Sequence, residues 1–153
     1  MDNILLSAHG VSMRIWIFLI AFFSFSALAE EDIDCDKAWT TLAINQCMYK
    51  DLVVAEKVMD KYLAKSLERN LEDEVSVDSI KKGQEAWLSY REEHCGAVYD
   101  TWRDGTIRTA MGLGCKLELT HQRTIDLWQS FLTYVDSTPS LLPEPKPYAP
   151  KSY

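Results

Sequence analysis

The stretch Gln84-x-x-Trp87-x-x-x-Arg91-x-x-x-Cys95 constrains the fold more than any other part of this chain. Spacings of three, four and four residues place these four side chains on one stripe of an α-helix. The stripe combines a large aromatic ring, a cation and a thiol, which is unusual for a plain core face. A small secreted domain held by disulfides can use all of them. We therefore expect a helix here whose cysteine forms a bridge.

The N-terminal part of the chain has the pattern of a signal peptide. Arg14 precedes an apolar run over residues 15–25, and Ala27 and Ala29 give the small-x-small pattern of a cleavage site. The run is shorter than the about 20 residues that span a bilayer. We expect cleavage after Ala29, a periplasmic or secreted protein, and no stable membrane anchor after cleavage. Residues before Met13 lie ahead of the basic segment, so Met13 is an alternative start.

Charge and cysteine content narrow the class of protein further. Loss of residues 1–29 removes Arg14 and Asp2, one charge of each sign, so the net charge stays at −7. An acidic protein favours a cationic partner and disfavours nucleic acid or an anionic membrane surface. All four cysteines follow the cleavage site, which predicts two disulfides. No C-x-x-C motif is present, so neither a zinc ribbon nor a thioredoxin-like site is indicated.

Hydrophobic periodicity predicts an all-α domain of three helices. Helical spacing of apolar residues extends over about residues 40–71, with Thr40 or Thr41 as the N-cap. A second helix is expected over about 77–102, capped by Ser76 or Asp78, with Gly83 allowing close approach of a neighbouring side chain.

The third helix is expected to form an antiparallel hairpin with the second through a turn at Gly105. Its start is uncertain because Gly112 and Gly114 weaken the helix before Cys115, after which a clean apolar stripe follows. We divide the chain into an N-terminal extension with signal peptide (1–29), a helical domain (30–136) and a Pro-rich tail (137–153). The tail composition favours an extended, disordered state over a docked, peptide-like one.

The hairpin geometry suggests a disulfide pairing. Cys95 and Cys115 lie ten residues before and after Gly105, so equal arms bring them level and predict Cys95–Cys115. Cys35–Cys47 is then left to hold the lead-in onto the first helix, and each bridge contributes about 3 kcal/mol. Two other pairings remain open: Cys35–Cys95 with Cys47–Cys115, and Cys35–Cys115 with Cys47–Cys95.

The order of these motifs resembles the LprI-type lysozyme-inhibitor N-terminal domain family, a group of small exported bacterial helical domains. The resemblance covers about residues 35–132. Its motifs are Cys35, Asn45-Gln46-Cys47, Tyr62, Gln84-x-x-Trp87-x-x-x-Arg91-x-x-x-Cys95, Gly105-Thr106 and Cys115-x-x-x-Leu119-Thr120-x-x-Arg123-x-x-x-Leu127. This chain departs from the pattern at Ile44 and in its Pro-rich tail. The resemblance implies a helical fold and, through the family name, inhibition of lysozyme.

Catalytic interpretations find little support in the residues. His94 and His121 have no metal-ligand spacing, and we expect neither a metal nor a cofactor. His94 is adjacent to Cys95, but neighbouring helical side chains point about 100° apart and Cys95 is expected to be oxidised. The paired carboxylates Glu92 and Glu93 carry no information in so acidic a chain. We therefore predict a protein that is not an enzyme.

Two groups of residues are candidates for a role. Gln84, Trp87, Arg91 and Arg123 form a structural signature, in which Trp87 fills the core and Arg91 packs over it, paired with a carboxylate or backbone carbonyls. Contact with a protein partner, such as a basic lysozyme-like hydrolase, is assigned to the hairpin tip. Its candidate residues are Tyr99, Trp102, Arg103 and Arg108. The alternative function is an envelope structural, interaction or toxin-neutralising (immunity-like) protein without a lysozyme target.

Overall fold

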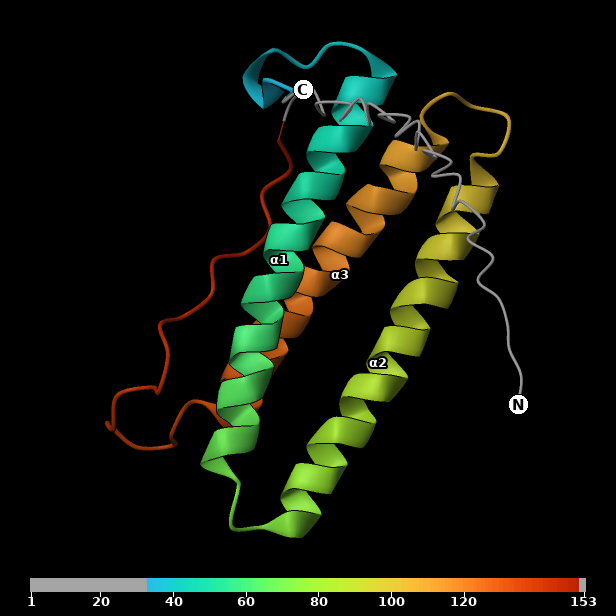
Figure 1. Ribbon diagram of the computed structural model, residues 1–153. Helices are drawn as coiled ribbons and strands as arrows, with labels where there is room; N and C mark the ends of the chain where they lie inside the picture. Colours follow the sequence, from blue (N-terminus) through green and yellow to red (C-terminus); the bar gives the residue numbers. More distant parts are fainter. Residues whose placement is uncertain (1–32, 152–153) are drawn as a thin grey trace, which may run out of the picture. The chain divides into compact units, whose positions relative to one another are not determined.

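The computed structural model describes residues 33–151, and three long α-helices dominate this part of the chain (Figure 1). A short 3-10 helix, η1 (Cys35–Lys37), leads into α1 (Thr41–Arg69), α2 (Glu74–Thr101) and α3 (Arg108–Phe131). Residues 33–151 contain no strand, so the predicted all-α, three-helix class is confirmed. No helix within this range has the length and apolar character needed to cross a membrane. The predicted signal peptide and cleavage site lie outside the described residues.

Helix α1 begins where the sequence predicts. The Thr40 hydroxyl accepts a hydrogen bond from the Ala43 backbone N–H at 3.2 Å, which satisfies one of the free amides of the first turn. The apolar stripe that follows is buried and faces the core; it comprises Cys47, Met48, Leu52, Ala55, Met59 and Tyr62.

Helix α2 begins three residues earlier than the sequence analysis expects, and its cap is Asp73 rather than Ser76 or Asp78. The Asp73 carboxylate accepts hydrogen bonds from the Ser76 backbone N–H at 3.2 Å and from the Ser76 hydroxyl at 2.6 Å. These hydrogen bonds hold the pKa of Asp73 below its usual value. Asp73 thus supplies both the cap and a negative charge, which suits a helix N-terminus.

Two glycines behave differently from one another. Gly112 lies in the first turns of α3, and a Cβ there would stand 3.2 Å from the Tyr99 Cβ of α2. Gly112 therefore permits the two helices to approach closely, which offsets its weak helix propensity of about 1 kcal/mol relative to alanine. Gly83 has no atom within 4 Å of such a Cβ, so the expectation that it admits a neighbouring side chain was wrong.

Helix α3 lies between the other two helices and packs against both, whereas α1 and α2 touch each other much less (Figure 1). Two buried apolar clusters form on α1 and the α3 region. One contains Met48, Leu52, Ala55 and Leu117, and the other contains Met59, Tyr62, Leu127 and Leu132. The core is therefore mainly an α1–α3 interface, and α2 is joined to it from one side.

Two disulfides join the elements as predicted. Cys35–Cys47 ties η1 to the first turns of α1, and Cys95–Cys115 ties α2 to α3. The Cα atoms of each pair are 5.6 Å apart. The two other pairings are thereby excluded, and no cysteine of the described residues is free.

In this structure the Pro-rich tail contacts the helices, and whether it is disordered in solution stays a prediction. It turns back after α3 through a hydrogen bond of 2.9 Å from the Leu141 N–H to the Leu132 carbonyl, and it then runs alongside α1 (Figure 1). Leu142 packs on the second apolar cluster and Tyr148 packs on the first. The predicted boundary between domain and tail at residue 136 stays a prediction.

Candidate functional site

The hairpin tip consists of residues 102–107 between α2 and α3. Backbone hydrogen bonds between residues three positions apart form this turn. The Trp102 N–H donates to the Tyr99 carbonyl at 3.3 Å, the Arg103 N–H to the Asp100 carbonyl at 3.2 Å, and the Gly105 N–H to the Trp102 carbonyl at 2.9 Å. The Cys95–Cys115 bridge holds the two arms behind it. The tip is therefore a defined turn on a covalently joined helical hairpin, which favours pre-organised presentation of its side chains.

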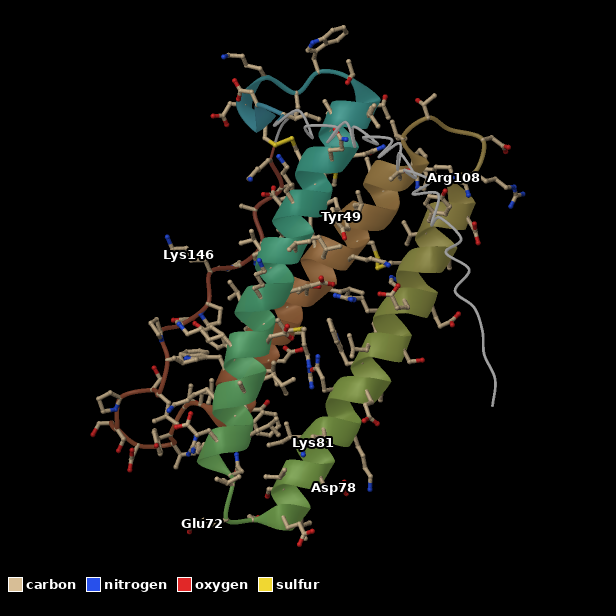
Figure 2. All side chains as sticks on the ribbon, in the orientation of Figure 1. Tyr49, Glu72, Asp78, Lys81, Arg108 and Lys146 are labelled. Atoms are coloured by element: carbon tan, nitrogen blue, oxygen red, sulfur yellow. A yellow bond between two sulfur atoms is a disulfide. The ribbon has the colours of Figure 1, made fainter. Side chains whose placement is uncertain are left out.

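Two of the four predicted contact residues are used inside the hairpin itself. The Arg108 guanidinium lies 3.8 Å from the centroid of the Tyr99 ring and pairs with Asp100 at 3.5 Å. Gly112 lies under the same ring. Tyr99 and Arg108 are thus held between the arms, where they fix the geometry of the tip (Arg108 is labelled in Figure 2).

The other two predicted contact residues point outward. Trp102 is 41% exposed and Arg103 is exposed as well, and no ion pair joins Arg103 to any of the described residues. Ile107 is 44% exposed on the same turn and was not singled out by sequence. An indole, an aliphatic side chain and an unpaired guanidinium therefore share the tip, which is the composition of an interface anchor.

The start of α1 adds exposed apolar residues at the same end of the helices. Because α1 and α2 are antiparallel, and α2 and α3 as well, the start of α1 and the α2–α3 turn share one end (Figure 1). Trp39 and Leu42 there are 85% and 70% exposed. Neither residue was predicted as a contact, although Leu42 is out of phase with the buried α1 stripe and Trp39 precedes the helix.

The signature residues occupy a different place, in the layer between α2 and its neighbours. Arg91 is 6% exposed, and its Nη1 donates to the Glu56 carboxylate and to the Thr120 hydroxyl, each at 2.9 Å. Its Nη2 pairs with Glu92 at 3.2 Å, and Glu92 also binds Lys116 at 2.5 Å. Arg91 therefore connects all three helices, and these cations hold the pKa of Glu92 below its usual value, Lys116 most of all.

Gln84 and Arg123 extend this polar layer by one turn. Arg123 Nε donates to the Gln84 side-chain oxygen at 3.0 Å, and Gln84 Nε2 lies 3.6 Å from the Met59 sulfur. Trp87 is half-buried rather than fully buried, with the Arg91 and Arg123 guanidinium groups 5.1 and 5.9 Å from its ring centroid. Partial burial lowers the pKa of Arg123. These contacts fit a structural role, because they face neighbouring helices rather than solvent.

Nothing at these positions assembles a reaction centre. Cys95 is disulfide-bonded, so it cannot act as a thiolate, and His94 stacks on Tyr90 with ring centroids 5.3 Å apart. Within residues 33–151, no group of three or more His, Cys, Asp or Glu side chains could hold a metal ion. The hairpin tip remains the strongest candidate site.

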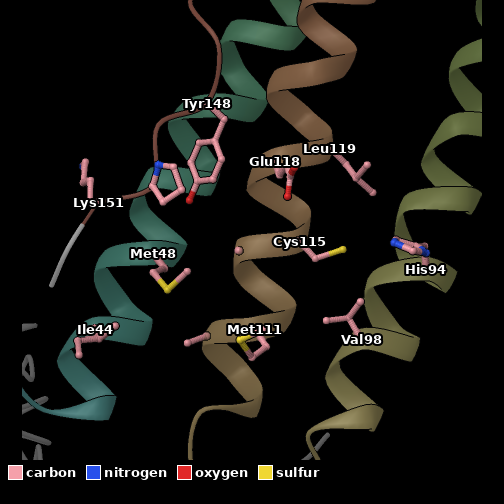
Figure 3. Close-up of a pocket in the computed structure, with 13 residues that line it drawn as sticks. Ile44, Met48, His94, Val98, Met111, Cys115, Glu118, Leu119, Tyr148 and Lys151 are labelled. Atoms are coloured by element: carbon pink, nitrogen blue, oxygen red, sulfur yellow. The ribbon is translucent and has the colours of Figure 1, made fainter.

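A pocket of about 700 Å³ lies over α3, between α2 on one side and α1 with the tail on the other (Figure 3). Its walls are mostly apolar and include Met48, Met111, Leu119, Val98 and Tyr148. His94 and Glu118 are its polar members on α2 and α3. The pocket therefore offers mainly apolar contact, with His94, Glu118 and Lys151 at its walls.

Fold and site together define a class: a small helical domain held by two disulfides, with a buried polar layer and an exposed hairpin tip. Comparison of sequences then gives the family. Residues 34–127 match the family described as lysozyme inhibitor LprI, and the chain belongs to that family. It is an inhibitor family, which implies a protein partner such as a lysozyme.

One curated relative is similar over most of its own length. An uncharacterized protein, R02472, of Rhizobium meliloti (strain 1021) is 28% identical over 105 residues, which cover 61% of this chain and 76% of the relative. No solved structure gave a significant match.

Proposed function

We propose that this protein is an exported, non-enzymatic inhibitor of lysozyme or another cell-wall hydrolase, and that it acts by covering the active-site cleft. The observation that carries the proposal is the pair Trp102 and Arg103, exposed on a disulfide-held tip. Family membership supports the inhibitory role. The exposed Trp102 and Arg103 side chains support the hairpin tip as the surface that contacts the enzyme.

The chemistry of the target explains why an arginine at a narrow tip suits this role. Lysozyme works with two carboxyl groups in a cleft. A guanidinium binds carboxylates through two parallel hydrogen bonds, and an indole beside it supplies apolar contact that excludes water. The net charge of −7 on the whole chain favours approach to a basic enzyme, while the tip presents the local cation.

The test is a titration of lysozyme activity with the purified mature protein and its variants. We expect inhibition by the wild type, and Trp102→Ala and Arg103→Glu should each weaken it by about tenfold or more, the size of an interface hot spot. Matched controls on α2 are Tyr90→Ala, 53% exposed, and Lys81→Glu, also on the surface. Both controls should inhibit as the wild type does.

The outcomes separate the activity from the surface. Absence of inhibition at micromolar excess, across lysozyme types, would remove the proposed activity. Inhibition that survives both tip substitutions would keep the activity and reject the tip as its surface. If no lysozyme is inhibited, the alternative is a structural or toxin-neutralising protein of the envelope. Crosslinking in an envelope extract would then identify its partner.

Export is part of the proposal. We propose that residues 1–29 are removed, that the mature domain begins at Glu30, and that the domain and tail divide near residue 136. N-terminal sequencing of the exported protein tests the cleavage, and a first residue other than Glu30 would contradict it.

A further inference from the structure

The Pro-rich tail meets the helices with a period of three residues. Leu142, Pro145 and Tyr148 are half-buried, whereas the residues between them are exposed. Lys151 continues the series, and its ammonium lies 2.7 Å from the Asp51 carboxylate of α1. A polyproline II helix has three residues per turn, so every third side chain faces the same way. The half-buried positions of the tail therefore have the spacing of one face of such a helix.

The groove that receives the tail binds its backbone as well as its side chains. The Trp128 indole N–H donates to the Leu142 carbonyl at 2.9 Å, and the Tyr62 hydroxyl donates to the Pro143 carbonyl at 2.7 Å. The Lys146 backbone also lies near His121. Proline has no N–H, and a polyproline II helix makes no internal hydrogen bonds, so its carbonyls are free to accept.

Side-chain contacts accompany each of these hydrogen bonds. Leu142 packs on the cluster of Met59, Tyr62, Leu127 and Leu132, beside the first two donors. Tyr148 packs on the cluster of Met48, Leu52, Ala55 and Leu117, and its ring centroid lies 5.2 Å from that of His121. Aromatic donors that bind carbonyls beside apolar clusters are the means by which proteins recognise proline-rich segments.

We propose that the groove between α1 and α3 is a binding site for an extended, proline-containing peptide, and that residues 139–151 are its resident ligand. The donors Tyr62 and Trp128 bind backbone carbonyls of the ligand. The two apolar clusters and the His121 ring contact ligand side chains that are spaced by multiples of three residues. The ligand pattern is an aliphatic residue, then proline, then tyrosine, then a cation, each three positions after the last. A partner that carries this pattern competes with the tail for the groove.

This site is separate from the hairpin tip, so the inference does not depend on lysozyme binding. Its donors come from α1 and α3, whereas the tip lies between α2 and α3. The matched family region ends at residue 127, before Trp128 and the tail. Part of the groove and the whole resident ligand thus lie outside the matched region.

The experiment is a competition between the tethered tail and a peptide of the same sequence added in solution. The probe is a fluorescent peptide of residues 139–151, titrated into the full mature chain and into a Leu142→Ala/Tyr148→Ala double variant. In the wild type the tethered tail competes at an effective concentration near the millimolar range, so binding should be weak. We expect the double variant to bind the peptide at least tenfold more tightly.

Register and site are tested with matched peptides and a further variant. Peptides with alanine at Glu144 or Lys146, whose side chains are exposed, should bind as the parent does. Peptides with alanine at Leu142 or Tyr148 should lose most of their binding. Adding Tyr62→Phe to the double variant removes one donor and should weaken the parent peptide several-fold.

Release of the tail is followed through the NMR signal of the Trp128 indole N–H, which should move in the double variant. If that signal does not move, the two side chains do not hold the tail and the proposal fails. If it moves but no peptide binds, the groove is not a peptide site and the proposal also fails. Equal binding of all peptides, whatever their register, would be equally fatal to it.

Discussion

Replacement of Arg91 by alanine tests the interpretation of the polar layer as the connection between α2 and the rest of the domain. The Arg91 and Glu56 side chains are 8% and 35% exposed, and Glu92 is 51% exposed. Removing one member of a buried ion pair costs about 3–5 kcal/mol. Both carboxylates can regain water, so we expect a loss at the low end, about 3 kcal/mol.

That loss translates into a clear shift in thermal stability. For a domain of this size, 1 kcal/mol moves the Tm by roughly 4 °C, so Arg91→Ala should lower it by roughly 12 °C. Circular dichroism at 222 nm with the disulfides intact is the assay. The matched control is Lys82→Ala, which breaks an exposed pair with Asp78 of 2.7 Å and should cost under about 1 kcal/mol.

A double-mutant cycle measures the coupling free energy between Arg91 and Glu56. Arg91→Ala and Glu56→Ala should be strongly non-additive, because the first substitution already removes the partner of the second. A Tm loss for Arg91→Ala no larger than that of the Lys82 control would refute the structural role. If the melting curve is unchanged while lysozyme inhibition disappears, Arg91 belongs to the binding surface instead.

Three further predictions follow from the packing. Gly112→Val should destabilise the hairpin by about 1–3 kcal/mol, because the new Cβ would stand 3.2 Å from the Tyr99 Cβ. Urea unfolding measures this loss, and the control Gly83→Ala should be neutral or stabilising. Loss of the Cys95–Cys115 bridge, with both residues changed to serine, should cost about 3 kcal/mol by chain entropy, measured in the same way. Burial lowers the pKa of His121 in the folded protein, although nearby Asp51 acts in the opposite direction. The neutral imidazole therefore contributes its full share of folding stability above about pH 6.5, and this share is lost as the pH falls through the lower folded pKa. His121→Gln should remove this pH dependence from Tm values measured between pH 4 and 8.

The fold was predictable from sequence because local patterns agreed with the tertiary contacts. Cys95 and Cys115 stand at equal distances from Gly105, and the structure joins them. The start of α2 was misplaced because Asp73 and Ser76 are both good caps, and only the hydrogen bonds distinguish them. Which of the two residues caps the helix depends on the local backbone geometry, which the amino-acid sequence does not reveal directly.

The candidate site was only partly predictable. Aromatic and cationic residues at a turn suggested the tip. The sequence could not tell that Arg108 stacks on Tyr99, whereas Arg103 has no such partner among residues 33–151. The tail was harder still. Its spacing of Leu142, Pro145 and Tyr148 is visible in the sequence, yet it has meaning only beside a groove built from residues far away in the chain.

The central position of α3 has a consequence for how the protein becomes folded after synthesis. Helices α1 and α2 contact each other little, and both pack mainly on the helix that comes last. A chain that has emerged only as far as α2 therefore lacks the surface on which its apolar stripes are buried, and its folding nucleus has to include α3. The N-terminal two thirds of the domain therefore stay open until the last helix has been made.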